Sequence, residues 1–382
     1  MTDLTAFQAA FQAALSTIYT QTGGSHGTSR RCLILSGGVD TAAILSASHS
    51  IGMHYGAALT VVTDDTAPDL AFSEACAKEY DLPHIVVRLA ADELIQQFLP
   101  TVIGQLKIYN GMLIRNSLVI AAVFQKASEL GYSYAIVGDG ADELFGGYSF
   151  MWNDVDNNNN IEDAAVEWRR KRDDMCAQWT FSTSDLAQRY GIQSYSPYTD
   201  PQFVDWAIAN TDRQDCIGVR PIRLFYGQEP TMHLTGKIIL REAYDTVSSW
   251  RRKDPIEVGS GATIIGHDDY WKDSISDEQF TKEAQALSKR GYRIRSKETL
   301  ANFRVFEQCF GVDGMNGGAD RIKRLPMGQG CVDCCFDIGH QMFCHMCGAY
   351  PAQRSKAATH YYDNDLRKMV AKEKDPNNEC HD

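Results

Sequence analysis

Three acidic side chains, Asp139, Asp142 and Glu143, lie close together in the segment GDGADELFGGY, which follows a short apolar run. Carboxylates this close repel one another, so a bound metal ion or a reacting group is the usual reason for such a cluster. The alternative is structural, because Asp139 and Glu143 could cap the following turn or helix start. The segment therefore predicts a reactive or metal-binding loop, with helix capping as the competing interpretation.

A glycine-rich segment, LILSGGVDT, has the composition of an anion-binding turn between a strand and a helix. Glycines let the backbone approach an anion closely, and the free N–H groups of a helix start favour negative charge. Asp40 would repel a phosphate, but it fits as a ligand of a magnesium ion that bridges to phosphate oxygens. A plain Gly-Gly turn is the structural alternative, and the sequence lacks the G-x-x-x-x-G-K-[ST] pattern of a kinase-type P-loop. The residues predicted to bind nucleotide phosphates are Ser36, Gly37, Gly38, Val39, Asp40 and Thr41.

Five cysteines and two histidines, His340 and His345, crowd the segment CVDCCFDIGHQMFCHMC at 331–347. Two C-x-x-C pairs separated by a short loop have the spacing of a structural zinc site, in which each pair supplies two thiolates. An iron–sulfur cluster can use the same ligands. The predicted zinc ligands are Cys331, Cys334, Cys344 and Cys347, with Cys335 as a substitute for Cys334.

The elements between these segments must bring their side chains together. From residue 31 onward, apolar runs typical of strands (RCLIL, HYGAALTVVT, HIVVRLA and YSYAIVG) alternate with helical patterns. This alternation predicts a doubly wound α/β fold, with a parallel sheet and helices on both faces. Ligands of such sheets bind at the carboxyl ends of the strands. The glycine-rich loops at 36–41 and 138–147 lie at those ends, so we expect them to share one site.

Four parts are expected along the chain. The first is an amphipathic helix that packs on the α/β domain through the stripe Leu4, Phe7, Phe11 and Leu15. The polar segment 153–163 is expected to be a solvated loop. The expected parts are 1–30 for this helix, 31–311 for the α/β domain with helical additions, 312–330 for a glycine-rich linker and 331–382 for a small Cys-rich metal-binding tail.

The chain has the composition of an ordinary globular protein, which limits the class of partner. Its 382 residues are enough for two or three domains with a sizeable core. No uncharged apolar run reaches about 18 residues, so a membrane span is not expected. The net charge of −12 disfavours sequence-independent nucleic-acid binding, which needs a basic face. Eleven cysteines without a signal-peptide pattern favour a reducing, cytoplasmic compartment.

Two of these segments resemble family signatures. SGGVDT is similar to the signature of the ATP pyrophosphatases, which cleave ATP between its α and β phosphates. GDGADELFGGY resembles the second signature of the synthetase domain of asparagine synthetases. The resemblance spans roughly residues 30–311 and implies a sheet of the adenine-nucleotide α-hydrolase type. Further segments agree in order, namely APDLAFSEA (67–75), LIRNS (113–117), YSPYTDPQFVDWA (195–207), GKIILREA (236–243) and RRKDPIEVGSG (251–261).

The resemblance implies an ATP-dependent carboxylate–amine ligase. Such an enzyme adenylates a small, amino acid-like carboxylate and releases pyrophosphate; ammonia or an amine then attacks the acyl carbon and AMP leaves. Asp40 and Asp142 match the family's magnesium ligands, and Lys253 matches a lysine that stabilises the developing charge. Gly138 and Gly140, with Gly259 and Ser260 of the loop after Lys253, are expected along ATP and pyrophosphate.

Two further roles follow from the resemblance. Asp139 stands where asparagine synthetases carry Glu and the β-lactam-forming branch carries Tyr, and it would take a proton from the attacking amine. Its side chain is one methylene shorter than that of Glu. Arg115 would bind the substrate carboxylate in a bidentate way, with an ordinary surface arginine as the alternative.

The start of the sequence departs from glutamine-dependent asparagine synthetases. Residue 2 is Thr in place of the nucleophilic cysteine of a glutaminase domain, and about 30 residues precede the first predicted strand. We therefore expect nitrogen from free ammonia, from a separate glutaminase partner or from an amine substrate. Two other functions stay open: an RNA sulfur-transfer enzyme of the same superfamily, which would suit the cysteine knuckles, and a nucleotide-binding regulator without turnover.

Overall fold

The chain divides into two compact units in a computed structural model. The first unit comprises Met1–Leu106 and Arg115–Ile264, and the second Lys107–Ile114 and Ile265–Asp382. The division differs from the expected boundary at residue 311, because the helices that precede it group with the Cys-rich segment. The structure describes residues 2–152, 161–311, 324–339 and 341–353; most of the predicted linker, most of the predicted polar loop, His340 and the end of the Cys-rich tail lie outside these ranges.

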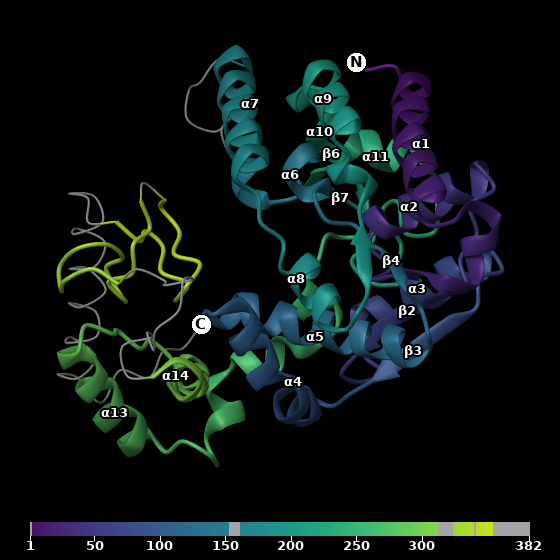
Figure 1. Cartoon of the computed structure of the whole chain (residues 1–382). Helices are drawn as coiled ribbons and strands as arrows, with labels where there is room; N and C mark the ends of the chain where they lie inside the picture. Colours follow the sequence, from purple (N-terminus) through teal and green to yellow (C-terminus); the bar gives the residue numbers. More distant parts are fainter. Residues whose placement is uncertain (1, 153–160, 312–323, 340, 354–382) are drawn as a thin grey trace. The chain divides into compact units, whose positions relative to one another are not determined.

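A parallel five-stranded sheet forms the centre of the first unit (Figure 1). Its strand order is β3-β2-β1-β4-β5, and every neighbouring pair is parallel. On the central strand, Leu33 lies opposite Ala58 on one side and Ile136 on the other. The predicted parallel α/β sheet is thus confirmed, with an additional edge strand, β5. The strands are β1 (Arg31–Ile34), β2 (Ala57–Val62), β3 (His84–Arg88), β4 (Tyr134–Ile136) and β5 (Gln193–Tyr195).

The sheet is doubly wound because the chain reverses its direction of travel at β1. It first moves outward to β2 and β3 through α2 (Val39–Ser50) and α3 (Pro68–Glu79). It then returns to β4, beside β1, through α4 (Ala91–Leu106) and α5 (Gly111–Glu129). Parallel crossovers are right-handed, so helices of the two directions cover opposite faces. The loops after β1 and β4 therefore leave neighbouring strands at the switch point where such sheets bind ligands.

Short helices and one antiparallel strand pair, β6 with β7, extend the first unit. No helix in the described part of the chain is long and apolar enough to cross a membrane. The remaining elements are α1 (Leu4–Gln21), η1 (Gly24–Arg30), α6 (Ala141–Phe145), η2 (Ser149–Met151), α7 (Ile161–Gln178), α8 (Ser182–Arg189), η3 (Pro197–Thr199), α9 (Pro201–Asn210), α10 (Arg213–Cys216), β6 (Gly218–Ile222), β7 (Thr231–Thr235), α11 (Ile238–Ala243), α12 (Ile256–Gly259), η4 (Ala262–Gly266), η5 (Asp268–Trp271), α13 (Asp277–Lys289) and α14 (Lys297–Phe310).

The N-terminal helix α1 packs into the core of the first unit, as its apolar stripe predicts. Phe7, Phe11 and Leu15 are fully buried, whereas Leu4 at the helix start is 37% exposed. The Phe7 ring lies 5.5 Å from the ring of Phe145, at an angle typical of edge-to-face aromatic pairs. Because Phe145 ends α6, the N-terminal helix supports the short helix of the acidic loop.

The connection between α4 and α5 is part of the second unit. The Tyr109 N–H donates a hydrogen bond to the Met346 carbonyl at 2.9 Å. The Tyr109 ring lies 5.1 Å from that of Phe303 and 5.3 Å from that of Phe306, both on α14. Residues 107–114 are therefore built into the surroundings of the Cys-rich segment, more than 200 residues further along the chain.

Candidate active site

The loop after β1 turns tightly at Gly37 and leads directly into α2. Gly37 has a φ of +68°, and a Cβ on it would lie 2.6 Å from the backbone nitrogen of Ser73, so only glycine fits. The N–H of Gly38, the N-cap of α2, donates to the Ser36 hydroxyl at 3.3 Å. The Thr41 hydroxyl lies 3.4 Å from that of Ser36. The predicted phosphate-binding residues thus share one loop at the start of a 12-residue helix, where an anion is favoured.

The acidic loop after β4 places its side chains in different surroundings. The N-cap of α6 is Gly140, which has a φ of +96° and no side chain to close the helix. The Asp139 carboxylate instead hydrogen-bonds to Thr183 in the first turn of α8. The Tyr148 hydroxyl donates to Oε1 of Glu143 at 2.7 Å. The capping alternative therefore does not account for Asp139, and Glu143 is held by a neighbouring tyrosine.

The two loops contact each other. A Cβ on Gly138 would lie 3.1 Å from the Cβ of Asp40, so the backbone of the acidic loop runs against the glycine-rich loop. The segment after β5 holds both loops in place. The Ser196 hydroxyl donates to the Asp139 carbonyl at 2.6 Å, and the Tyr198 hydroxyl donates to the Asp40 carbonyl at 2.9 Å. The acids of the two loops are thus brought to one place by segments far apart in the sequence.

Two lysines pair with the acids where the loops meet. The Lys237 Nζ lies 2.7 Å from each carboxylate oxygen of Asp40 and 2.6 Å from Oδ1 of Asp142. The Lys253 Nζ lies 2.9 Å from Oδ2 of Asp142. The structure therefore brings together Asp40, Asp142 and Lys253, as expected. Lys237 was not among the residues predicted for the site, although the segment GKIILREA that contains it resembles a segment of the family.

The ion pairs determine the charge states of Asp142 and Lys253. Burial alone would raise the pKa of Asp142, but the ammonium groups of Lys237 and Lys253 outweigh burial and hold this pKa well below its usual range. Burial would likewise lower the pKa of Lys253, but Asp142 and Asp40 raise it above its ordinary value. Both side chains are therefore charged at neutral pH.

The pKa of Asp139 is shifted in the opposite direction to that of Asp142. Burial, together with the nearby carboxylates of Glu143 and Asp142 and against the hydrogen bond from Thr183, raises the pKa of its carboxyl to about 6. A carboxyl group with a pKa near neutrality is suited to proton transfer, because it can both accept and release a proton.

A buried arginine connects the glycine-rich loop to the segment that carries Lys253. The Arg251 guanidinium lies 2.5 Å from Oδ1 of Asp69 on α3 and donates to the Ser36 carbonyl at 3.0 Å. The same guanidinium lies over the Phe72 ring, 4.7 Å from its centre. Neither Arg251 nor Asp69 was singled out from the sequence, although both lie in segments that resemble the family. Their contacts fix the start of the 251–261 loop against the loop after β1.

The rest of this loop contacts the start of α3 and the residue that directly follows β2. The Ser260 hydroxyl donates to the Ile256 carbonyl at 2.7 Å, and the Ser260 carbonyl accepts from the Thr63 N–H at 2.8 Å. A Cβ on Gly259 would collide with the Asp69 carboxylate, so the backbone passes close to that buried acid. The loop expected to close over pyrophosphate is thus fixed by contacts with α3 and with Thr63. The Ser260 hydroxyl is occupied by its hydrogen bond to the Ile256 carbonyl, one helical turn earlier.

The predicted carboxylate-binding Arg115 faces a carboxylate of the chain itself. Its Nη2 lies 3.9 Å from Oε1 of Glu257, and both side chains are largely buried. The neighbouring Asn116 side chain accepts a hydrogen bond from the Glu257 N–H at 3.0 Å. The start of α5 therefore packs on α12, next to Gly259 and Ser260.

Comparison with known proteins agrees with this arrangement. A family model described as asparagine synthase matches residues 27–195. This segment therefore resembles an asparagine synthase domain. The match covers both loops, Asp139 and Arg115, and it confirms the resemblance seen in SGGVDT and GDGADELFGGY. The two lysines of the site lie beyond the matched residues. They belong to the same compact unit, and they pair there with Asp40 and Asp142.

The curated proteins that this chain resembles are longer than the chain itself. A probable glutamine-hydrolyzing asparagine synthetase of Dictyostelium discoideum is 26% identical over 227 residues, which cover 56% of this chain and 38% of that protein. The glutamine-hydrolyzing asparagine synthetase B of Escherichia coli is 21% identical over 254 residues, which cover 64% of this chain and 41% of that protein. The matches thus span less than half the length of these relatives.

Likeness to solved structures is weaker. An NH3-dependent NAD synthetase of Campylobacter jejuni covers 56% of this chain and 94% of its own, with a TM-score of 0.29 and 13% identity. A predicted subunit of a tRNA methyltransferase from Methanocaldococcus jannaschii covers 52% of this chain and 80% of its own, with a TM-score of 0.26 and 15% identity. At these levels the likeness says nothing about the substrate of this chain.

Four cysteines of the second unit converge as a metal site would require. The ligand sulfurs of Cys331, Cys334, Cys344 and Cys347 all lie within 4.8 Å of one another. The Sγ atoms of Cys331 and Cys347 are 3.6 Å apart, as are those of Cys334 and Cys344. A tetrahedral zinc ion with Zn–S bonds of about 2.3 Å would hold its sulfurs about 3.8 Å apart. The four thiols therefore fit a metal ion.

Cys335 is not the substitute ligand that the sequence left open. It has a φ of +61°, and its Sγ points to the Gly291 carbonyl at 3.6 Å, away from the other four sulfurs. His345 is also outside the cluster, with its ring 5.2 Å from that of Phe343. The choice between the adjacent cysteines is thus made by the backbone turn at Cys335.

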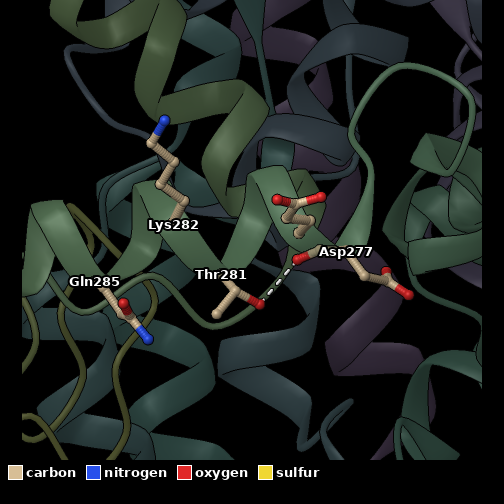
Figure 2. A pocket seen from close by; sticks show the side chains of 5 residues that line it. Asp277, Thr281, Lys282 and Gln285 are labelled. Carbon is tan, nitrogen blue, oxygen red and sulfur yellow. Dashed lines mark hydrogen bonds between the residues drawn. The ribbon is translucent and has the colours of Figure 1, made fainter.

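A separate hollow lies in the second unit. It has a volume of about 490 Å³ and is lined by five side chains of α13, as Figure 2 shows. One of them, Thr281, donates its hydroxyl hydrogen bond to the Asp277 carbonyl of the same helix at 2.8 Å. Because all its lining residues belong to α13, the hollow is widely open to solvent, and we do not consider it a candidate active site.

Proposed function

We propose that the chain is an AMP-forming carboxylate–amine ligase. ATP would adenylate a small, amino acid-like carboxylate with loss of pyrophosphate; ammonia or an amine would then attack the acyl carbon, form the amide and release AMP. The observation that carries the proposal is the convergence of Asp40 and Asp142 with Lys237 and Lys253 where the loops after β1 and β4 meet. Both loops belong to the segment that resembles an asparagine synthase domain.

The glycine-rich loop would cradle the phosphates. The backbone N–H groups at the start of α2, together with the Ser36 and Thr41 hydroxyls, favour negative charge at that point. The acidic loop would approach the nucleotide through Gly138 and Gly140, which have no side chain in the way. Lys253, whose side chain is 25% exposed, would stabilise the charge on the departing pyrophosphate and on the adenylate.

Asp40 and Asp142 fit a bound cation, because oxygens of both carboxylates converge on a single positive atom, the Nζ of Lys237. We propose that these acids hold magnesium when it arrives with ATP. Magnesium would supply charge neutralisation at the phosphates. The acids would orient the triphosphate between the two loops, and Lys253 would remain beside Asp142.

Asp139 would act on the amine. Its raised pKa, about 6, leaves it mainly ionised at pH 7 and able to take a proton. Arg115 would bind the carboxylate of the substrate, in place of its long contact with Glu257. Nitrogen would come from ammonia, from an amine substrate or from a separate glutaminase; the relatives named above are described as glutamine-hydrolyzing.

The cysteines disfavour the alternative of RNA sulfur transfer, which needs an accessible, ionisable thiol. Burial raises the pKa of Cys76 and of Cys176 to about 12, and burial also raises that of Cys216. Cys309 is exposed, but burial of its sulfur still raises its pKa. The four clustered cysteines fit a structural metal, for which we propose zinc. None of the four cysteines outside the cluster that are named here thus has the properties of a sulfur carrier.

The proposal is tested by exchange of labelled pyrophosphate into ATP with a panel of amino acids and other small carboxylic acids. We expect exchange that depends on one class of carboxylate and needs neither ammonia nor transfer RNA. Exchange that appears only with transfer RNA would instead support the sulfur-transfer alternative. Nucleotide binding without exchange under any condition would support the regulator.

Substitution of Asp139 by asparagine should separate the two half-reactions. Without a base for the amine, amide formation should fall by about 10²–10⁴-fold, while pyrophosphate exchange stays within a few-fold of the unchanged protein. In the unchanged protein, amide formation should fall as the pH drops through about 6, because Asp139 is then protonated. Loss of exchange as well would place Asp139 in nucleotide binding, and full amide formation would leave it without a catalytic role.

A further inference from the structure

Lys237 is buried and closely surrounded, which is unusual for a lysine. Its side chain is 1% exposed, and its backbone has a φ of +60°, in the left-handed region that is unfavourable for a residue with a side chain. Its N–H donates to the Phe145 carbonyl at 2.9 Å, which ties it to the end of α6. A Cβ on Gly147 would lie 2.5 Å from the Lys237 Cε, so the acidic loop closes directly over the lysine stem.

The segment that carries Lys237 is also fixed from its other side. The Arg241 side chain is fully buried one turn later on α11, and it donates to the carbonyls of Gly236, Ser249 and Arg251. These bonds connect the Lys237 turn to the segment that leads into Lys253. The position of the Lys237 ammonium is therefore determined by the fold, and the ammonium is not at the end of a freely moving surface chain.

Two acids and two lysines of the site have charges that cancel. The Asp40 and Asp142 carboxylates carry two negative charges, and Lys237 and Lys253 carry two positive charges, so the four groups sum to zero. The Lys237 Nζ lies between the two acids, within 2.7 Å of an oxygen of each. A divalent ion at that point would meet two ammonium groups in a largely buried setting, where charge repulsion is poorly screened.

We propose that Lys237 is the resident cation of the Asp40–Asp142 pair, and that a divalent metal enters this pair only together with a polyphosphate. The negative charge of the polyphosphate would then take over the Lys237 ammonium and release both carboxylates to the metal. This inference rests on the proposed function only for the identity of the polyphosphate. The exclusion of free metal by Lys237 follows from the ion pairs themselves.

Binding of Mn²⁺, used as a spectroscopic stand-in for magnesium, tests the inference on the nucleotide-free protein. Electron paramagnetic resonance measures free Mn²⁺ directly, without turnover. We expect weak binding to the unchanged protein and binding at least about tenfold tighter to Lys237→Met, in which the two acids have lost their cation. Lys237→Arg is the matched control, since it keeps the charge and should bind as weakly as the unchanged protein. A further substitution, Asp40→Asn in the Lys237→Met protein, should abolish the gained site.

Two further measurements keep the test decisive. If Lys237→Met is unstable, its thermal unfolding midpoint should rise with Mn²⁺ while that of Lys237→Arg does not. In the unchanged protein, added pyrophosphate should tighten Mn²⁺ binding at least about tenfold. Tight binding of Mn²⁺ alone to the unchanged protein, lost in Asp142→Asn, would overturn the inference while leaving the proposed ligase intact. A missing pyrophosphate effect, even with a clear gain in Lys237→Met, would overturn the coupled entry of metal and polyphosphate that the inference states.

Discussion

Replacing Asp142 by asparagine should lower the rate of pyrophosphate release by about 10²–10³-fold. The carboxylate lies between the Lys237 and Lys253 ammonium groups, and its removal leaves Lys253 without its 2.9 Å partner. The positive charge of the site would then be poorly placed for the triphosphate, and one proposed magnesium ligand would be gone. A coupled pyrophosphate assay at saturating magnesium and ATP measures the loss.

The matched control for this substitution is Asp65→Asn. Asp65 pairs with Arg88 at 2.8 Å, but its side chain is 76% exposed. Exposed ion pairs contribute little, about 0–1 kcal/mol, so this variant should keep both its activity and its stability. Breaking the buried pairs of Asp142 should cost about 3–5 kcal/mol, so circular dichroism must show that the variant is folded at the assay temperature. A folded Asp142→Asn protein with unchanged turnover would contradict the assignment of the site.

Loss of the metal should unfold the surroundings of the Cys-rich segment. We expect one tightly held metal ion per chain, and Cys334→Ser should lose it because one of four sulfurs is gone. Structural zinc supplies about 10–16 kcal/mol of folding free energy in isolated fingers, so its removal should expose residues 324–353 to protease. Elemental analysis and limited proteolysis of the same samples measure both effects.

The neighbouring cysteine provides the control for the metal site. Cys335→Ser changes an adjacent thiol whose Sγ points to the Gly291 carbonyl, outside the cluster. This variant should retain the metal and the protease resistance of the unchanged protein. Equal loss of metal in both variants would show that the wrong sulfurs have been assigned. Detection of iron together with visible absorbance would show that the cysteines hold an iron–sulfur cluster and not zinc.

The sequence was sufficient to predict the sheet and the meeting of its two loops, for a physical reason. Buried parallel strands appear as apolar runs between helices, and the polar residues that follow them must lie at one edge of the sheet. Asp40 and Asp142 could therefore be expected together, although about 100 residues separate them. The edge strand β5 was missed because it is only three residues long, Gln193–Tyr195, and is half-exposed.

Interactions made by tertiary packing could not be predicted in the same way. Lys237 enters the site through a left-handed turn after an antiparallel strand pair, and nothing in the pattern around it signals that turn. Similarly, α7 has the composition of an exposed charged helix, but Trp168 and Arg172 are buried, and the Arg172 guanidinium lies 4.9 Å from the centre of the Trp168 ring. The burial of Trp168 and Arg172 becomes evident only once the elements that cover α7 are known.

The most direct test of the proposed ligase reaction is the position at which ATP is cleaved. Phosphorus NMR of a reaction with the purified protein, magnesium, ATP, the carboxylate identified by exchange and an ammonium salt distinguishes the products without coupling enzymes. The proposed ligase should form AMP and pyrophosphate in equal amounts, only when the carboxylate is present, and Asp142→Asn should form neither. Formation of ADP and phosphate, or release of pyrophosphate that does not depend on a carboxylate, would contradict it.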